Sequence, residues 1–259
     1  MDNSVKTALV IGLSSDIGGG LAQRLKQDGW RVFGTARAPN KLSHTEAVSF
    51  NMFDAVPVWH FKRLLKDQGW DLLIMSIGSL EPVGKFFDVN FDHWAESVWV
   101  NFTAQMRVLH ALWPVRNVKR IADVMLFAGG GTNGPMPGYS AYCASKIALI
   151  KMCELLHDEN EDLNIFSIGP GFVKTKIHEQ TLKAADGPWK DKIVKFLETE
   201  GTSIDDIYDH MQWCMKAGRK VAGGRNFSTV HDDWKSTDPN WFLSSGNPDL
   251  YRLRRKEVL

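Results

Sequence analysis

The chain has 259 residues, of which 44% are hydrophobic and 24% charged, and it contains 22 Gly. This length and balance are typical of a globular protein with a sizeable core and exclude disordered, collagen-like and membrane-spanning classes. The 31 Lys and Arg residues against 30 Asp and Glu leave a formal net charge of +1, so we expect no broad positive field for nucleic-acid binding.

Short apolar runs alternate with helical patterns along the chain. Strands are expected at the runs rich in Val, Ile, Leu and Phe, which are 8–11, 32–35, 72–75, 121–127 and 165–168. Helices are expected at 17–27, 56–67, 91–113, 141–157 and 204–217. Asp54 and Ser203 are candidate caps of the second and the last of these helices. The alternation predicts an α/β fold, a doubly wound parallel sheet in a single domain over residues 1–259.

Two segments do not fit the alternation. Residues 129–138 form a loop rich in Gly and Pro, and residues 172–202 form an irregular, Lys-rich segment. Long loops at the carboxyl ends of parallel strands are where open α/β folds place their sites. We therefore expect the functional site beside these two segments.

Cysteine usage and the amino terminus favour a cytoplasmic protein. The cysteines, Cys143, Cys153 and Cys214, form no CxxC pair and no metal-ligand spacing, so we expect a reducing compartment and no metal site. The first apolar run ends at Gly12 and is too short for a signal peptide. No apolar segment approaches the roughly 18 residues of a membrane helix, so no membrane partner is expected.

The first strand runs directly into Gly12-Leu13-Ser14-Ser15-Asp16-Ile17-Gly18, a turn that opens a helix. Without side chains, the backbone of such a turn can approach a pyrophosphate at the helix N-terminus. The spacing is neither GxGxxG nor that of a P-loop, so an ordinary strand-to-helix turn is the alternative interpretation.

Tyr142 and Lys146 lie four residues apart, which on a helix puts both side chains on one face. A nearby ammonium favours the phenolate and lowers the pKa of a Tyr from about 10, so the Tyr can exchange a proton with an alcohol or carbonyl oxygen. Taken alone, such a pair is more often an ordinary surface contact.

In this order and at this separation, the two motifs resemble the short-chain dehydrogenase/reductase family, in its compact single-domain branch with a Rossmann fold. The resemblance extends to Asn101 and to Pro170-Gly171-Phe172-Val173-Lys174-Thr175. It implies an NAD(P)-dependent oxidoreductase acting on CH–OH groups. Tyr142 would be the catalytic acid, Lys146 would lower its pKa and hold the nicotinamide ribose, and Asn101 would anchor a water in the proton relay.

The resemblance also implies a set of cofactor contacts from four segments of the chain. They are Gly12, Ser14, Ser15, Asp16, Ile17, Gly18, Gly78, Tyr142, Lys146, Pro170, Gly171, Val173 and Thr175. The end of the second strand then favours NADP(H), because the acidic position that would bind the adenosine ribose is Ala36 and Arg37 follows it. Asn51 and Met52 would line the adenine. NAD(H) is the alternative, with Arg37 as an exposed loop charge.

Three departures from the family pattern stand out. Asp16 replaces the middle Gly of the first motif, and Met75-Ser76-Ile77-Gly78 replaces Asn-Asn-Ala-Gly while keeping its Gly. Gly129 stands where the family usually has a catalytic Ser, and losing one such donor commonly costs on the order of a hundredfold in rate. Thr132, Asn133 or a hydroxyl of the substrate itself are the candidates to replace it.

The substrate segment, 172–202, is polar and basic. It carries Lys174, Lys176, His178, Lys183, Lys190 and Lys192, with Trp189. These residues suit a phosphorylated or nucleotide-linked substrate, although Lys at helical spacing is also typical of a solvated face. Gly129-Gly130-Gly131-Thr132, together with Asp233-Trp234 and Leu253-Arg254-Arg255, resembles relatives encoded in polysaccharide and nucleotide-sugar pathways.

The sequence therefore predicts an NADPH-dependent oxidoreductase that interconverts a ketone and a secondary alcohol, on a keto-sugar or a nucleotide-linked sugar. The alternative is an NADP-binding protein of the same fold with lost or weak redox activity, acting as a sensor or a complex subunit. Gly129 and the altered segment 75–78 favour the alternative, and the intact Asn101, Tyr142 and Lys146 oppose it.

The family resemblance implies a homotetramer or homodimer formed through the helix that bears Tyr142. Apolar residues wrap more than one face of this helix, which indicates a second surface that covers it. These residues are Ile147, Leu149, Ile150, Cys153 and Leu156.

Overall fold

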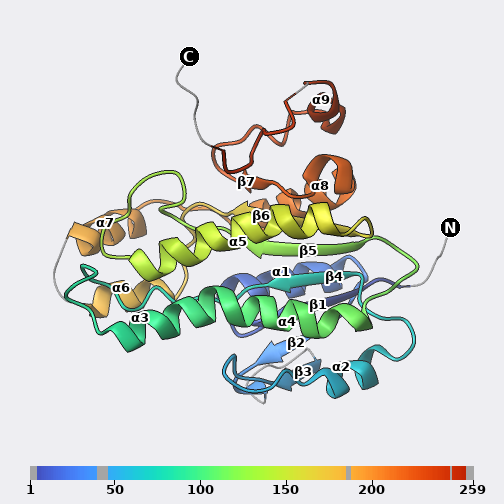
Figure 1. Ribbon diagram of the computed structural model, residues 1–259, viewed down its shortest axis with the longest axis horizontal. Helices are drawn as coiled ribbons and strands as arrows, with labels where there is room; N and C mark the ends of the chain where they lie inside the picture. Colours follow the sequence, from blue (N-terminus) through green and yellow to red (C-terminus); the bar gives the residue numbers. More distant parts are fainter. Residues whose placement is uncertain (1–4, 40–45, 185–187, 246, 255–259) are drawn as a thin grey trace.

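The protein is described by a computed structural model over residues 5–39, 46–184, 188–245 and 247–254. Within these residues the chain forms a parallel sheet with strand order β3-β2-β1-β4-β5-β6-β7 (Figure 1). The strands are β1 (Thr7–Ile11), β2 (Arg31–Ala36), β3 (Glu46–Ser49), β4 (Leu72–Met75), β5 (Ala122–Phe127), β6 (Leu163–Gly169) and β7 (Asn226–Ser228). The strand order reverses at β1: β2 and β3 lie on one side of it, and β4 to β7 lie on the other. This is the arrangement of a doubly wound Rossmann fold.

Helices connect the strands and cover both faces of the sheet. They are α1 (Asp16–Gln27), α2 (Val58–Leu65), α3 (Phe91–Val98), a π-helical turn η2 (Trp99–Thr103), α4 (Ala104–Leu112), a 3-10 turn η3 (Trp113–Val115), α5 (Ser140–Glu159), α6 (His178–Lys183), α7 (Pro188–Leu197), α8 (Ile204–Ala222) and α9 (Pro239–Ser244). In the described residues, no helix is long and apolar enough to cross a membrane.

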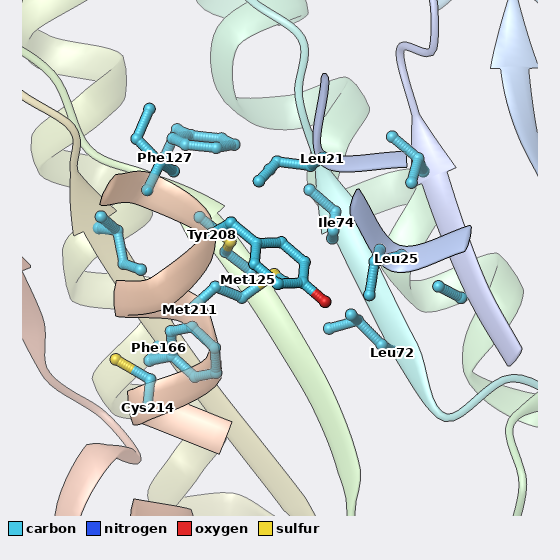
Figure 2. Close-up of a cluster of buried hydrophobic side chains, with 14 of the residues drawn as sticks. Leu21, Leu25, Leu72, Ile74, Met125, Phe127, Phe166, Tyr208, Met211 and Cys214 are labelled. Carbon is cyan, nitrogen blue, oxygen red and sulfur yellow. The ribbon is translucent and has the colours of Figure 1, made fainter. Parts of the chain in front are cut away.

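The core divides into two layers because successive residues of a strand point to opposite faces. Ala8 and Val10 of β1 face a cluster that includes Leu21 of α1 and Met211 of α8, part of which is drawn in Figure 2. Alternate strand residues face a second cluster. Its members include Leu9 and Ile11 of β1, Phe61 of α2, Val108 of α4 and Leu149 of α5. The sheet is thus buried on both sides, which explains why its central strands read as continuous apolar runs.

The predicted fold class is confirmed, and each of the five predicted strands lies where it was expected within two residues. The predicted helix 91–113 is interrupted by the π turn η2. Ser203 caps α8 through a hydrogen bond from the Asp206 N–H to its Oγ (3.0 Å). The cap predicted at Asp54 is wrong, because Pro57 is the N-cap of α2 and a proline disfavours helical backbone in the residue before it.

Several elements are missing from the sequence-based prediction. β3 and β7 are only four and three residues long, too short for a clear alternation. The segment 172–202 was predicted to be irregular, and this is wrong for two parts of it, because α6 and α7 lie there. Arg255, which belongs to the predicted tail motif, and the chain ends of the predicted domain lie outside the described residues.

Candidate active site

A cleft of about 610 Å³ opens at the carboxyl ends of the parallel strands. Its walls come from the loops that follow β1, β2, β3, β4, β5 and β6, with Tyr142 and Lys146 contributed by α5. Fifteen of the sixteen residues predicted to contact a cofactor line it, namely Gly12, Ser14, Ser15, Asp16, Ile17, Arg37, Asn51, Met52, Gly78, Tyr142, Lys146, Pro170, Gly171, Val173 and Thr175. Residues that are distant in sequence are therefore brought to one cavity.

The turn after β1 depends on its glycines for close packing. Gly12 has a φ of +103°, and a Cβ on it would lie 2.5 Å from the Ser76 carbonyl oxygen. Gly18 is the predicted cofactor contact that is not among the described residues lining the cleft. It packs against the turn, since a Cβ on it would lie 2.5 Å from the Gly12 carbonyl oxygen. Ser15 caps α1 by accepting the Gly18 N–H (2.9 Å), and its Oγ lies 2.8 Å from the Ser76 Oγ. Ser76 thus links the altered segment after β4 to the glycine turn.

The far end of the cleft lies beside β2 and β3. Ala36 is buried at the end of β2, and the exposed Arg37 follows it at the cleft wall. Asn51 accepts the Phe53 N–H (3.2 Å), and Met52 is buried. Among the described lining residues the carboxylates are Asp16 and Glu81, which belong to other loops. The charged group at this end of the cleft is therefore a guanidinium.

Tyr142 and Lys146 lie together in the cleft on one face of α5. The buried Lys146 ammonium donates to the Phe127 carbonyl (2.8 Å), and its Nζ lies 5.6 Å from the centroid of the Tyr142 ring. Burial lowers the pKa of Lys146 to about 8. Burial also raises the pKa of Tyr142 above its ordinary value, which is opposite to the lowering predicted from Lys146. At neutral pH the phenol is protonated and can serve as a proton donor.

Gly129 makes an unexpected contact with Tyr142. A Cβ on Gly129 would lie 2.2 Å from the Tyr142 hydroxyl oxygen, so this hydroxyl already fills the space of a side chain at position 129. With the tyrosine in this position, a serine at position 129 would clash with its hydroxyl.

Thr132 and Asn133, the predicted replacements for the serine, are not among the described residues that line the cleft. The Thr132 hydroxyl donates to the Gly129 carbonyl (3.2 Å), so its proton is already in use. Asn133 lines a separate cavity of about 150 Å³, together with His231, Tyr251 and Arg252. The structure does not bring these two side chains to the site, because the glycine-rich loop turns away after Gly129.

Asn101 lies in the π turn η2 and is fully buried. Its amide donates to the Ser79 carbonyl (2.8 Å) and to the Ser97 hydroxyl (3.1 Å), and its oxygen accepts the Ser79 N–H (2.9 Å). Gln105, one helical turn on, donates to the Ile77 carbonyl (3.1 Å). These two side-chain amides hold the loop after β4, which forms one wall of the cleft. Asn101 therefore positions the backbone of this loop at Ser79. Gln105 was missed, since a glutamine among the other polar residues of this helix belongs to no recognised motif.

The helix α6 supplies part of the cleft wall. The Gln180 side-chain oxygen accepts the Leu80 N–H (2.8 Å), which joins α6 to the loop after β4. His178 lies 3.0 Å from the Val173 carbonyl through its Nε2, and burial lowers its pKa. Both residues line the cleft. The Gln180 contact was missed in the sequence analysis, because its segment was expected to be irregular.

The basic character predicted for the substrate segment is only partly present at the cleft. Of its predicted basic residues, Lys176 and His178 are among the described lining residues. Lys183 pairs instead with Glu179 on α6 (3.5 Å). Trp189 packs on the turn at Gly138, where a Cβ would be 2.6 Å from its ring. Within the described ranges, no group of three or more His, Cys, Asp or Glu residues is arranged to hold a metal ion.

Comparisons with known proteins agree with this arrangement. The family model for short chain dehydrogenase matches residues 6–186. The chain is 28% identical over 139 residues to an uncharacterized oxidoreductase of Schizosaccharomyces pombe, spanning 52% of this chain and 56% of that relative. It is 25% identical over 219 residues to the serine 3-dehydrogenase of Rhizobium radiobacter, spanning 80% of this chain and 86% of that one.

Solved structures show the same fold. A short chain dehydrogenase/reductase from Saccharomyces cerevisiae superposes with a TM-score of 0.76 at 18% identity, covering 88% of this chain and 98% of that one. A short chain dehydrogenase of Shigella flexneri, complexed with NADP, superposes with a TM-score of 0.71 at 20% identity, covering 86% and 96%. The fold is therefore shared with proteins that differ widely from this chain in sequence.

Proposed function

Because the chain belongs to the short-chain dehydrogenase family and is an NAD(P)-dependent oxidoreductase acting on CH–OH groups, we propose that it interconverts a ketone and a secondary alcohol with NADPH as its preferred cofactor. The observation that carries this proposal is the meeting of Tyr142 and Lys146 with the glycine turn and Arg37 in one cleft. The protein acts on a small carbonyl or alcohol molecule in the cytoplasm.

The cleft fits a dinucleotide from one end to the other. The glycine turn lets the backbone come close to a pyrophosphate at the start of α1, which is a 12-residue helix. Arg37 supports NADPH, because a guanidinium can bind the additional phosphate and the described residues of the wall beside Ala36 offer no carboxylate to the ribose. NADH is the alternative cofactor. When bound, the nicotinamide supplies the hydride chemistry.

Tyr142 is proposed to donate the proton to the substrate oxygen. Its buried hydroxyl is protonated at neutral pH, since desolvation raises its pKa. Once the proton has left, the phenolate needs a nearby positive charge, and the Lys146 ammonium, fixed by the Phe127 carbonyl, supplies it. Asn101 holds the loop at Ser79 so that the wall facing Tyr142 keeps its shape.

The substrate is proposed to carry a hydroxyl group beside its carbonyl, as a keto-sugar or its nucleotide-linked form does. A developing oxyanion needs a second donor besides Tyr142. Gly129 has no side chain to offer, and the Thr132 hydroxyl donates to the Gly129 carbonyl. A neighbouring hydroxyl on the substrate can provide this hydrogen bond itself. The segment 172–202, with α6 as the cleft wall, is proposed to select the substrate.

A second function is favoured by one observation, the absence of a side-chain donor at Gly129. In that case the protein binds NADP but has weak or no redox activity and serves as a sensor or a complex subunit. A substrate screen separates the two functions. NADPH oxidation is followed with keto-sugars, nucleotide-linked keto-sugars and matched ketones that lack the neighbouring hydroxyl. Turnover of the hydroxylated compounds supports the reductase, and tight NADPH binding without turnover of any of them supports the sensor.

The quaternary structure is proposed to be a homodimer or homotetramer formed through α5. Leu149, Ile150 and Cys153 are buried in the core and are not free for an interface. The support comes from Ile147 and Leu155, which are 39% and 43% exposed on α5.

A further inference from the structure

Lys176 joins the segment after β6 to the glycine turn after β1, across 160 residues of sequence. Its backbone N–H donates to Asp16 Oδ2 (2.8 Å), and its ammonium lies 3.5 Å from Asp16 Oδ1. The same ammonium donates to the Ser14 carbonyl (2.6 Å). All three residues line the cleft. One lysine therefore engages both oxygens of a carboxylate and also lies against the turn itself.

The carboxylate of Asp16 creates an electrostatic problem at this position. Asp16 is the first residue of α1, where the helix dipole favours a negative charge. A dinucleotide pyrophosphate is favoured at the same helix end for the same reason. Two negative groups at one helix terminus repel each other. A dinucleotide site that contains Asp16 thus needs a compensating cation.

Lys176 is placed to be that cation. Among the described lining residues, the other Lys and Arg side chains are Arg37 and Lys146. Arg37 lies after β2, and Lys146 is held by the Phe127 carbonyl beside Tyr142. Of these three side chains, Lys176 contacts the glycine turn, through its hydrogen bond to the Ser14 carbonyl.

We propose that Lys176 is a cofactor-binding residue of the pyrophosphate subsite, positioned by Asp16, whose charge it neutralises. The inference rests on the proposed dinucleotide-dependent function and assigns Lys176 to the cofactor instead of the substrate. Because the pyrophosphate is common to both cofactors, Lys176 acts on NADPH and NADH alike. This separates it from Arg37, which acts on the additional phosphate of NADPH alone.

The side chains of Lys176 and Asp16 are 60% and 41% exposed, respectively, and an exposed ion pair adds little to folding stability. Substitutions here should therefore leave the fold intact, which thermal unfolding followed by circular dichroism checks. Lys176→Met removes the charge and keeps the aliphatic stem. Asp16→Asn removes the opposite charge and keeps an oxygen that can accept the Lys176 N–H. Lys183→Met is the matched control, because it removes the same charge from the same segment where Lys183 contacts Glu179 on α6.

The experiment measures the dissociation constants of NADPH and NADH by titration calorimetry for the wild type, each single variant and the double variant. We expect Lys176→Met to weaken both cofactors by about tenfold, the size of one uncompensated charge at short range. In the Asp16→Asn background the same change should weaken them less than about threefold, because the carboxylate no longer positions the Lys176 ammonium and no longer needs to be neutralised. Lys183→Met should change both constants less than about twofold.

Three outcomes would overturn this inference and leave the proposed function standing. One is a Lys176→Met effect no larger than that of Lys183→Met. Another is an effect confined to NADPH, which would move Lys176 to the additional phosphate. The third is equal effects in both Asp16 backgrounds, which would remove the coupling. A wild type that binds neither cofactor would overturn the proposed function together with this inference, whereas normal binding with no effect of Lys176→Met overturns this inference alone.

Discussion

Restoring the family's serine at position 129 is expected to inactivate the enzyme. A Cβ on Gly129 would lie 2.2 Å from the Tyr142 hydroxyl oxygen, while ordinary contact begins at 3.4 Å, so the two groups must separate by the difference, 1.2 Å. A misplacement of about 1 Å in a catalytic group can cost on the order of a hundredfold in rate. Gly129→Ser and Gly129→Ala should therefore both lower the hydride-transfer rate by about a hundredfold, even though the serine brings an additional donor.

The assay is single-turnover oxidation of NADPH with a hydroxyketone, accompanied by NADPH titration to show that cofactor binding is retained. Gly134→Ala is the matched control in the same loop, since a Cβ there meets nothing within 4 Å. Overpacking at Gly129 should also lower the free energy of unfolding by about 1–3 kcal/mol. A Gly129→Ser enzyme as fast as the wild type would refute the reasoning, because it would mean that the tyrosine can leave this space without losing its function.

The other predictions concern the cofactor, pH and assembly. Arg37→Ala should weaken NADPH by about tenfold or more and leave NADH nearly unchanged, and an equal loss for both in fluorescence titrations would reject the phosphate role. The burial that lowers the pKa of Lys146 to about 8 means that its ammonium is lost as the pH rises, so kcat should fall with a midpoint at or above about pH 8, since bound phosphates favour the charged form. A fall with a midpoint below pH 7 would contradict this assignment. Ile147→Asp should dissociate the proposed oligomer in light scattering, and a monomeric wild type at micromolar concentration would contradict the α5 interface.

Local sequence patterns were sufficient to predict those parts of the site that lie within one helix or one turn. Tyr142 and Lys146 face one cleft because four residues are about one helical turn. The glycine turn follows from a buried strand that ends at Gly12. The two-faced burial of the sheet explains why continuous apolar runs predicted its central strands correctly.

Contacts between distant segments could not be predicted in this way. The meeting of Asp16 with Lys176 depends on how the loop after β6 folds back over α1, and no spacing encodes it. The contact between Gly129 and the Tyr142 hydroxyl depends on the angle at which α5 leaves its loop. Thr132 and Asn133 were close to Gly129 in sequence, but a glycine-rich loop can turn either way, so sequence proximity did not bring them to the cleft. The chain's departures from its family are thus explained by tertiary contacts.

The most direct test of the account compares the wild type with Tyr142→Phe. The central claim is that the Tyr142 hydroxyl donates the proton to a ketone in a cleft that binds NADPH. Single-turnover NADPH oxidation with a hydroxyketone should slow by at least about a hundredfold in Tyr142→Phe, while the NADPH dissociation constant stays the same, because one hydroxyl is removed and the ring remains. A Tyr142→Phe rate within about threefold of the wild type would contradict the account, since it would assign proton transfer to another group.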